Sequence, residues 1–520
     1  MSASVNAGSA RSAGRFTITA NTLVFGLSAA TLVLHLFAGR NYGYFVDELY
    51  HLACGRHLDW GYVDQPPLIA AIAWGVRVTL GQSLFAIRFL PALAAAIEVA
   101  LAALIARELG GRRFAQLLTC LSVMIAPGIL MIDGLLTMNA FEPLFWLGCA
   151  YLFIRIVNGG DQKLWIWIGV LAGLGLENKY SMLIFGAGIV VGILLTPQRR
   201  LFLSPWPWIG GAIAFLLFLP NVLWNIQHHF PFLEMLANTQ RGGRNVALSP
   251  LTFFIQEAVT LFPLTLPIWL TGLWFFFFSR AGKPYRALGW AWLFTAAVIA
   301  TLSPRIYYLY PAMPLLFAAG GVAWEDWLQQ PKFVLLKIAY LVPMVVLGAL
   351  AVPFSVPVLS PEAYIRYSNF LNFQPPRIET HKLGPMPQLY ADQFGWENMV
   401  EKVAGAYNKL PADVRARTAI FAKNYGQAGA IDLLGPKYGL PSAISGHQSY
   451  FLWGPRNFTG ESIIVLGSDE ADLKMHCLSV QKVANVYHPY SMPYEHFDVF
   501  HCRGLKQPLK EYWPRVKSWG

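Results

Sequence analysis

Residues 84–106 read LFAIRFLPALAAAIEVALAALIA, a mainly apolar run that is long enough to cross a lipid bilayer as one helix. Further runs of this kind lie before and after it. The expected spans are 18–39, 84–106, 114–130, 135–155, 164–177, 181–196, 206–225, 256–278, 287–302, 306–325 and 333–355. The sequence therefore predicts a polytopic all-α membrane protein with about 11 transmembrane helices.

The composition agrees with a membrane protein. Of 520 residues, 55% are hydrophobic and 13% are charged, with a mean hydropathy of +0.44. Soluble globular chains carry about 25% charged residues, so a cytosolic multidomain enzyme is excluded. The net charge of +11 does not indicate nucleic acid as a partner, because the basic residues punctuate apolar runs instead of clustering on one amphipathic face.

A shift in charge density marks the main domain boundary. About 10% of the first 356 residues are charged, against about 19% of the last 164. We therefore expect a membrane domain over 18–356 and a water-soluble domain over 357–520. Residues 1–17 are rich in Ser, Ala and Gly and are expected to form a disordered cytosolic tail.

Loop charges give the expected topology, because basic loops stay in the cytoplasm. With the N-terminus inside, every second loop is basic, and eleven spans place the C-terminal domain outside. The inner-loop residues are Arg11, Arg15, Arg107, Arg112, Arg113, Arg155, Lys163, Arg199, Arg200, Arg280, Lys283, Arg286, Lys332 and Lys337. Most acidic residues of the membrane domain then fall on the outer side, which is the expected working face. Two long outer loops, 40–83 and 226–255, could lie in the interface and roof a cavity.

The C-terminal segment has a mixed α/β pattern. Strand-like runs lie at 418–423, 462–466 and 497–501, and helical periodicity covers 395–409 and 470–484. The stretch Asn424–Gly429 opens an expected helix whose first amides could hold an anion, although it lacks the glycine spacing of a dinucleotide site. An oxidising compartment would permit a disulfide between Cys477 and Cys502, with two free thiols as the alternative. No His/Cys spacing resembles a zinc site.

The strongest candidate for chemistry is Phe45–His51, just beyond the first span, followed by Tyr62–Leu68. A partly buried carboxylate at the lipid boundary, such as Asp47, can accept a proton from a hydroxyl group. The alternative is that Asp47 and Glu48 only cap the next helix and meet water.

Several motifs together resemble the bacterial family-39 glycosyltransferases, which are GT-C membrane enzymes related to protein O-mannosyltransferases and to the aminoarabinose transferase of lipid A. The motifs are Asp47–His51, Asp64–Leu68, Asn178–Ser181, Arg305–Pro311, Asn424–Gly429 and His488–Tyr494. The resemblance implies a bacterial inner-membrane enzyme with a periplasmic C-terminal domain. It also implies a polyprenyl-phosphate-linked sugar donor, a lipid or glycan acceptor, and inversion at the anomeric carbon.

The resemblance also implies roles for individual residues. Asp47 would be the general base, and Glu48, His51 and Asp64 would shape the donor or acceptor pocket. Relatives often carry an acidic residue at the start of the fourth span, where this chain has Asn139. Asp133 and Glu142 are the possible substitutes. Relatives of this kind work without a metal, so no metal or other cofactor is expected.

A departing phosphate needs cations near the outer membrane surface. The basic residues positioned for this are Lys179, Arg241, Arg244 and Arg305, and the hydroxyls of Tyr307 and Tyr308 could bind the same phosphate. The alternative for the cations is snorkelling to lipid headgroups, and for the tyrosines an interfacial aromatic belt.

The favoured hypothesis is therefore a glycosyltransferase that modifies an envelope lipid, such as lipid A, or another envelope glycan. Protein O-mannosylation differs only in its acceptor and stays open. A lipid or sugar transporter is the alternative from another class. It is disfavoured because the sequence has no internal repeat and its ionisable residues lie on one side. A non-catalytic scaffold is the last alternative.

Overall fold

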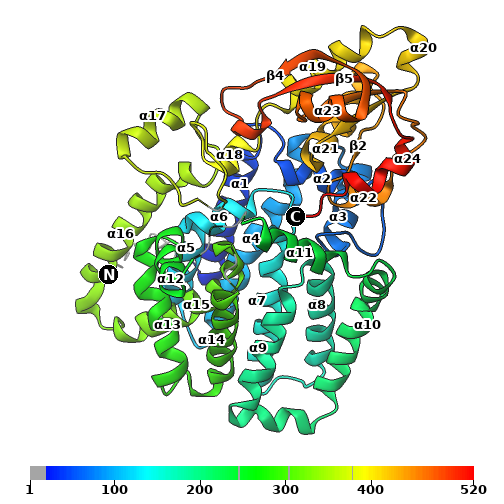
Figure 1. The fold of residues 1–520 in the computed structure, drawn as a ribbon. Coiled ribbons are helices and arrows are strands. Elements are labelled where there is room, and N and C mark those ends of the chain that lie inside the picture. Colours follow the sequence, from blue (N-terminus) through cyan, green and yellow to red (C-terminus); the bar gives the residue numbers. More distant parts are fainter. Residues whose placement is uncertain (1–18, 244–245, 247, 303–304, 378) are drawn as a thin grey trace, which may run out of the picture.

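The computed structural model describes residues 19–243, 246, 248–302, 305–377 and 379–520. The expected tail at 1–17 and the expected phosphate ligand Arg244 lie outside the described residues. In Figure 1 a bundle of long helices occupies the lower part of the molecule, and the C-terminal domain covers its upper end.

The bundle is built from apolar helices. They are α1 (Ala20–Ala38), α4 (Leu84–Glu108), α5 (Arg113–Ile125), α6 (Pro127–Asp133), α7 (Met138–Val157), α8 (Leu164–Asn178), α9 (Met182–Leu194), α10 (Trp206–Gln227), α12 (Pro250–Thr260), α13 (Leu266–Phe278), α14 (Arg286–Thr301), α15 (Met313–Trp327) and α16 (Val334–Ala351). The long outer loops contain α2 (Val46–Cys54), α3 (Leu68–Thr79) and α11 (Pro231–Arg241).

Every predicted span overlaps a helix, but the predicted number of spans is not confirmed. Within the described residues, six helices are long and apolar enough to cross a membrane, or up to nine if each of three bent pairs forms one span. Two predicted spans fall short, because α8 has 15 residues and α14 has 16. The bent pairs break at prolines, as at Pro127 between α5 and α6, where the bend is 68°.

Small residues let the membrane helices approach closely. A Cβ atom added to Gly169 of α8 would lie 2.2 Å from the carbonyl oxygen of Gly210 in α10. Such backbone contact is how helices associate in lipid, where hydrophobic burial between helices gives little advantage. These contacts hold the helices that carry the candidate site residues.

The C-terminal domain is organised around a five-stranded mixed sheet in the order β2-β1-β3-β5-β4. The strands are β1 (Thr418–Ala422), β2 (Ile444–Ser445), β3 (Ser462–Leu466), β4 (Cys477–Val486) and β5 (Phe497–Leu505). The helices are α17 (Pro361–Leu371), α18 (Gln388–Ala391), α19 (Trp396–Asn408), α20 (Ala412–Arg415), α21 (Tyr425–Leu434), α22 (Ser449–Trp453), α23 (Glu470–His476) and α24 (Leu509–Tyr512). β1 pairs in parallel with β2 and β3, whereas β5 is antiparallel to β3 and β4.

The helix predicted over 470–484 is wrong in its second half. α23 ends at His476, and the following residues form β4, which pairs with β5. Leu473, Cys477 and Val480 are spaced as on one face of a helix, and they pack in one hydrophobic cluster although the chain changes from helix to strand between them. This spacing in the sequence explains the wrong prediction.

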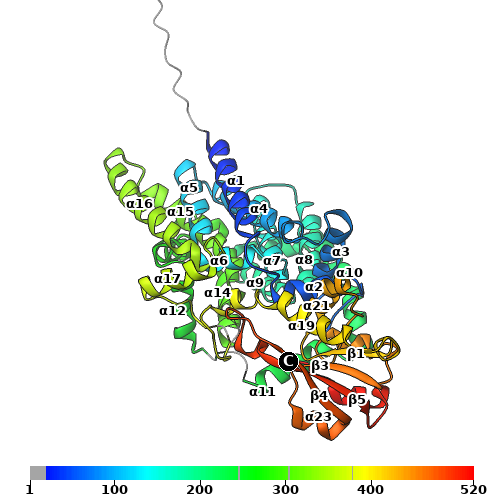
Figure 2. The same cartoon turned by 90° about the horizontal axis from the view of Figure 1, so that it is seen from above.

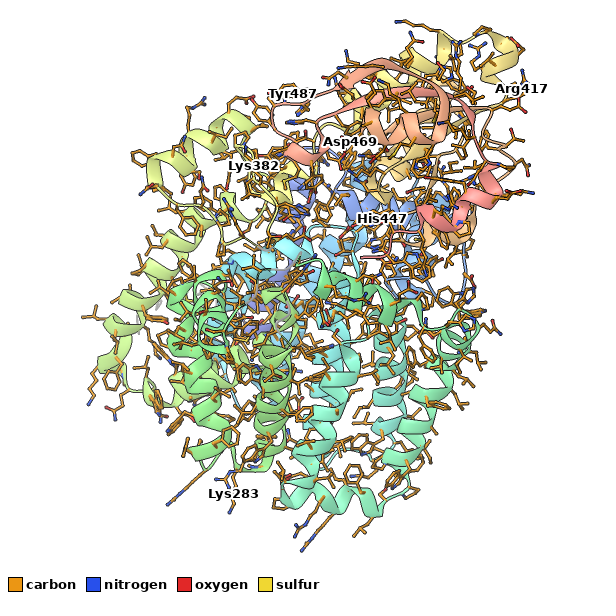
Figure 3. The ribbon with its side chains drawn as sticks, viewed as in Figure 1. Lys283, Lys382, Arg417, His447, Asp469 and Tyr487 are labelled. Carbon is orange, nitrogen blue, oxygen red and sulfur yellow. A yellow bond between two sulfur atoms is a disulfide. The ribbon has the colours of Figure 1, made fainter. Side chains whose placement is uncertain are left out.

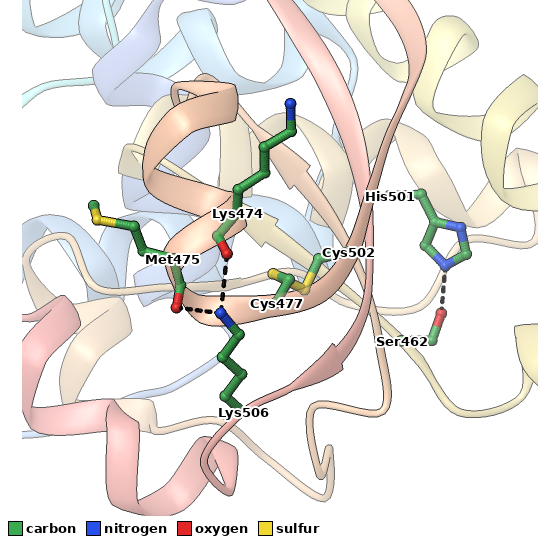
Figure 4. Close-up of a disulfide and its surroundings, with 7 residues drawn as sticks. All are labelled: Ser462, Lys474, Met475, Cys477, His501, Cys502 and Lys506. Carbon is green, nitrogen blue, oxygen red and sulfur yellow. Dashed lines mark hydrogen bonds between the residues drawn. A yellow bond between two sulfur atoms is a disulfide. The ribbon is translucent and has the colours of Figure 1, made fainter.

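A disulfide joins Cys477 of β4 to Cys502 of β5 (Figure 4). Next to it, the Lys506 ammonium group donates hydrogen bonds to the carbonyl oxygens of Lys474 and Met475, at 3.1 and 2.9 Å. These contacts fix the end of α23 against the end of β5. The edge strand β4 is therefore linked covalently to its neighbour β5.

Candidate active site

Asp47 lies in the first turn of α2, at the end of the bundle that the C-terminal domain covers (Figure 1). Its side chain is half-buried and lines a cavity of about 550 Å³. The alternative in which Asp47 only caps a helix in bulk water does not describe this environment.

The cavity is lined from two sides. The membrane domain contributes polar residues from α2, the start of α7 and the segment before α15, and the C-terminal segment contributes residues 379–392. The polar lining residues are Asp47, Thr137, Asn139, Arg305, Tyr307, Glu379, Gln388 and Asp392. Four of the predicted site residues, Asp47, Asn139, Arg305 and Tyr307, thus meet at one cavity.

Lys179 lies beside this cavity and binds two other predicted residues. Its ammonium nitrogen is 2.8 Å from Asn139 Oδ1 and 2.7 Å from Glu142 Oε2. The same nitrogen lies 4.4 Å from the ring centroid of Tyr308, a cation–π contact. Ser181 also donates a hydrogen bond to Glu142. Asn139 therefore links the lysine to the cavity.

Arg305 has a carboxylate partner from the C-terminal domain. Its guanidinium group forms an ion pair with Glu379 and donates a hydrogen bond to the Tyr307 hydroxyl at 3.2 Å. Gln388 donates to the other oxygen of Glu379 at 2.9 Å. The cavity lined by Asp47 is therefore also lined by a guanidinium group, which is paired with Glu379.

Glu48 is enclosed by protein. Its carboxylate is fully buried, and Arg88 of α4 binds both oxygens at 2.9 and 2.8 Å. The backbone amides of Phe45 and Leu136 donate to the same carboxylate at 2.9 and 3.0 Å. Glu48 therefore fixes the start of α2 to α4 and to the loop before α7.

His51 is also enclosed. It is buried, with Nδ1 2.9 Å from the Leu136 carbonyl oxygen and Nε2 2.8 Å from Gln65 Oε1. Neither Glu48 nor His51 is among the described residues that line the cavity.

Asp64 is not among the described residues that line the cavity. It accepts a hydrogen bond from the Tyr50 hydroxyl at 2.8 Å. Burial raises the pKa of Asp64 to about 6, and the negative charge of Asp47 acts in the same direction. The charge of Asp47 therefore disfavours the ionised form of Asp64.

Two further predicted residues lie elsewhere. Asp133 is buried at the end of α6, and its Oδ1 atom has no hydrogen-bond partner among the described residues. Arg241 is exposed at the end of α11. Neither is among the described residues that line the cavity.

Sequence reasoning missed the residues that the C-terminal segment brings to the cavity, namely Glu379, Gln388 and Asp392. Asp392 is buried, accepts a hydrogen bond from the Tyr494 hydroxyl at 2.8 Å, and has its pKa raised by burial to about 8. These residues lie in a Pro-rich stretch with little regular structure, where no periodicity or motif marks them. Tyr425, which also contacts Asp47, belongs to the motif for which the sequence predicts an anion site instead.

In the described part of the chain, no three His, Cys, Asp or Glu residues are grouped so that they could hold a metal ion. The expectation that no metal is needed stays a prediction.

Comparisons with known proteins agree on one fold. The sequence profile of a family described as dolichyl-phosphate-mannose-protein mannosyltransferase matches residues 64–224. Lipid A galacturonosyltransferase RgtD of Rhizobium johnstonii is 24% identical over 323 residues, which cover 60% of this chain and 65% of the relative.

Two solved structures align with more than nine-tenths of the chain. ArnT from Cupriavidus metallidurans, bound to undecaprenyl phosphate, aligns with a TM-score of 0.60 at 14% identity, over 92% of this chain and 97% of that one. The arabinofuranosyltransferase AftD from Mycobacteria aligns with a TM-score of 0.53 at 12% identity, over 94% of this chain and 40% of that one.

The chain has the GT-C fold and resembles the family-39 glycosyltransferases.

The profile match includes Asp64, Asn139, Glu142 and Lys179 but begins after Asp47. The structural alignment covers both domains. The resemblance inferred from scattered motifs is thereby confirmed.

Proposed function

We propose that this protein is an integral membrane glycosyltransferase that moves a sugar from a polyprenyl-phosphate-linked donor to an envelope lipid or glycan. The observation that carries the proposal is a single cavity lined by Asp47 on one element and by Arg305, Asn139 and Tyr307 on others. A carboxylate and a phosphate-binding group at one cavity are what an inverting transfer from a sugar phosphate requires.

The donor phosphate would bind on the cationic side of the cavity. Arg305 can bind a phosphate bidentately. The Tyr307 hydroxyl oxygen lies 3.2 Å from the guanidinium group of Arg305, and Lys179, which is bonded to Asn139, adds a second positive charge. ArnT, which shares the fold, binds undecaprenyl phosphate, and this supports a donor of the same class. Since Glu379 pairs with Arg305, a phosphate would have to displace that carboxylate or share the guanidinium group with it.

In the proposed reaction, Asp47 accepts the proton of the acceptor hydroxyl group as that oxygen attacks the anomeric carbon. The bond between the anomeric carbon and the phosphate oxygen breaks on the opposite face, so the configuration inverts. The bonding electrons leave with the phosphate, and Arg305 and Lys179 stabilise the charge that develops there. The step balances without a metal ion or a redox cofactor.

We propose that the cavity faces the periplasm of a bacterial inner membrane. Lys283, in one of the basic loops, lies at the end of the bundle opposite the C-terminal domain (Figure 3). By the positive-inside rule this end belongs in the cytoplasm, which leaves the cavity and the disulfide outside.

The acceptor in this proposal is a lipid such as lipid A. Support comes from RgtD, a lipid A galacturonosyltransferase whose alignment spans 65% of its length. The profile described as a protein mannosyltransferase keeps a protein hydroxyl as the second candidate acceptor.

The test compares envelope glycolipids by mass spectrometry in cells with the wild-type chain, a deletion, Asp47→Asn or Asp59→Asn. Asp59 is the matched control, an exposed carboxylate in the same outer loop. We expect a sugar-sized mass to be lost from one lipid in the deletion and in Asp47→Asn, with the remaining activity reduced by about 10²–10⁴-fold. Asp59→Asn should keep the modification.

Two results would contradict this proposal. If no lipid changes but a periplasmic protein loses hexose, the acceptor is a protein. If Asp47→Asn keeps full modification, the proposed general base is wrong.

A further inference from the structure

The motif Asn424–Gly429 opens α21, directly after β1 in the C-terminal domain. We infer that this motif docks the C-terminal domain onto α2 and that Tyr425 is the positioning residue for the Asp47 carboxylate. The inference rests on the proposed function, in which Asp47 is the general base. It makes the C-terminal domain a part of the active site and assigns a task to Asn424, Tyr425, Gly426, Gln427 and Gly429 of the motif.

The decisive contact joins two parts of the chain that are 378 residues apart. The Tyr425 hydroxyl group donates a hydrogen bond to Asp47 Oδ1 at 2.8 Å. A carboxylate has two oxygens that can each accept hydrogen bonds. The hydrogen bond from the tyrosine to Oδ1 restrains the rotation of the carboxylate, and Oδ2 is the oxygen that this bond leaves to receive the proton of the acceptor.

The ring of Tyr425 is itself held in place. It stacks with His447, with ring centroids 4.9 Å apart and planes at 7°, and with Tyr50, with centroids 4.6 Å apart and planes at 28°. Its backbone amide donates to His447 Nδ1 at 3.1 Å. Two stacked neighbours restrict the rotation of an aromatic side chain, so the direction of the hydroxyl group is restrained.

The two glycines of the motif explain how α21 comes so close to α2. A Cβ atom on Gly426 would lie 2.5 Å from Val46 Cγ2, and one on Gly429 would lie 2.8 Å from the Leu49 carbonyl carbon and oxygen. Val46 and Leu49 flank Asp47 on α2. Figures 1 and 2 both show α21 beside α2. Only a residue without a side chain permits this spacing, and the spacing brings Tyr425 within hydrogen-bonding distance.

The two amide side chains of the motif fix the start of the helix. Asn424 accepts from the Gln427 backbone amide at 2.9 Å, which caps α21, and donates to Glu495 at 2.8 Å. Gln427 donates to the other oxygen of Glu495 at 2.8 Å and accepts from the Lys423 amide at 3.0 Å. The amides of Tyr425 and Gln427 are thus already bonded to protein atoms, which favours docking over the anion site expected from the sequence.

The test uses the full-length protein in nanodiscs, with a lipid extract from the deletion strain as the source of donor and acceptor. Tyr425→Phe keeps the stacked ring and removes only the hydroxyl group. We expect its maximal rate to fall about tenfold, since a hydrogen bond to a charged group is lost. The apparent KM for the extract should not change, and neither should the thermal stabilisation by undecaprenyl phosphate alone.

Tyr450→Phe is the control, because Tyr450 is a buried tyrosine of the same domain that also donates to a carboxylate, Asp432, at 2.9 Å, and neither residue is among the described residues that line the cavity. Its rate should stay within about twofold of wild type. In the Asp47→Asn background, Tyr425→Phe should cause no further loss, because the two residues act through one contact. Gly426→Ala is a second variant that keeps Tyr425 but separates the helices, and it should lower the maximal rate without changing the apparent KM.

The outcomes separate this inference from the proposed function. If Asp47→Asn is inactive while Tyr425→Phe and Gly426→Ala transfer sugar at the wild-type rate, the positioning role is overturned and the function stands. A rise in apparent KM at unchanged maximal rate would make Tyr425 a substrate-binding residue instead. Full activity of Asp47→Asn would remove both proposals together.

Discussion

Acidic residues near the cavity occupy very different environments, although they look similar in the sequence. Glu48 forms a buried ion pair with Arg88, whereas its neighbour Asp47 lines the cavity. A buried ion pair of this kind is costly to break, because removing one partner leaves an uncompensated charge. The pair therefore fixes the orientation of α2, and this orientation determines where the Asp47 side chain lies.

Asp392 predicts a pH dependence of stability. Its pKa is about 8 in the folded protein and about 3.8 when exposed, so the folded state holds the proton more tightly. The stabilisation is complete below pH 4 and is lost as the pH rises through 8. Asp64 and Glu495 have pKa values raised to about 6 and 7, so both are mostly ionised at pH 8. The melting temperature should therefore fall between pH 7 and 9, and less so in Asp392→Asn.

The measurement is thermal unfolding of the purified protein at the two pH values. Asp413→Asn is the control, because that carboxylate is 75% exposed. An equal fall in wild type and Asp392→Asn would assign the pH dependence to other groups.

At the scale of elements, the sequence predicted most of the framework. Each predicted apolar run overlaps a helix, although the predicted number of spans is not confirmed, and the strand-like runs at 418–423 and 462–466 became β1 and β3. Asp47, Asn139 and Arg305, which the sequence analysis selected, line one cavity, and their roles there stay predictions. The stretch 372–392 could not be predicted, because Glu379 and Asp392 are carried by a largely irregular segment whose path depends on long-range contacts.

The ion pair between Glu379 and Arg305 leads to a prediction about lipid binding. The Glu379 carboxylate is 2% exposed and pairs with Arg305, the expected phosphate ligand. In Glu379→Gln the guanidinium group loses its charged partner, so undecaprenyl phosphate should bind more tightly, by roughly tenfold for a hydrogen-bonded ion pair. Thermal shift against lipid concentration measures this.

The control is Glu461→Gln, which removes the partner of Arg417 on the exposed surface. It should leave lipid binding unchanged. Weaker binding in Glu379→Gln would mean that Glu379 orients the arginine for the phosphate instead of competing with it.

For the whole molecule, the orientation in the membrane can be tested with two cysteines. Asp469→Cys lies in the C-terminal domain and Lys283→Cys at the other end (Figure 3). An impermeant maleimide added to intact cells should label the first and spare the second. The native thiols of Cys54, Cys120 and Cys149 are buried, so background labelling should be low. The reverse pattern would invert the proposed topology.

The distance along the chain between Asp47 and Tyr425 has a consequence for biogenesis. A ribosome delivers the aspartate to the membrane hundreds of residues before it reaches the tyrosine. A nascent chain, or one truncated by a premature stop codon, would thus hold its membrane helices without a finished catalytic centre. If the proposed function holds, sugar transfer would begin only after the last segment has been translocated and folded, and incomplete products in the membrane would be inactive.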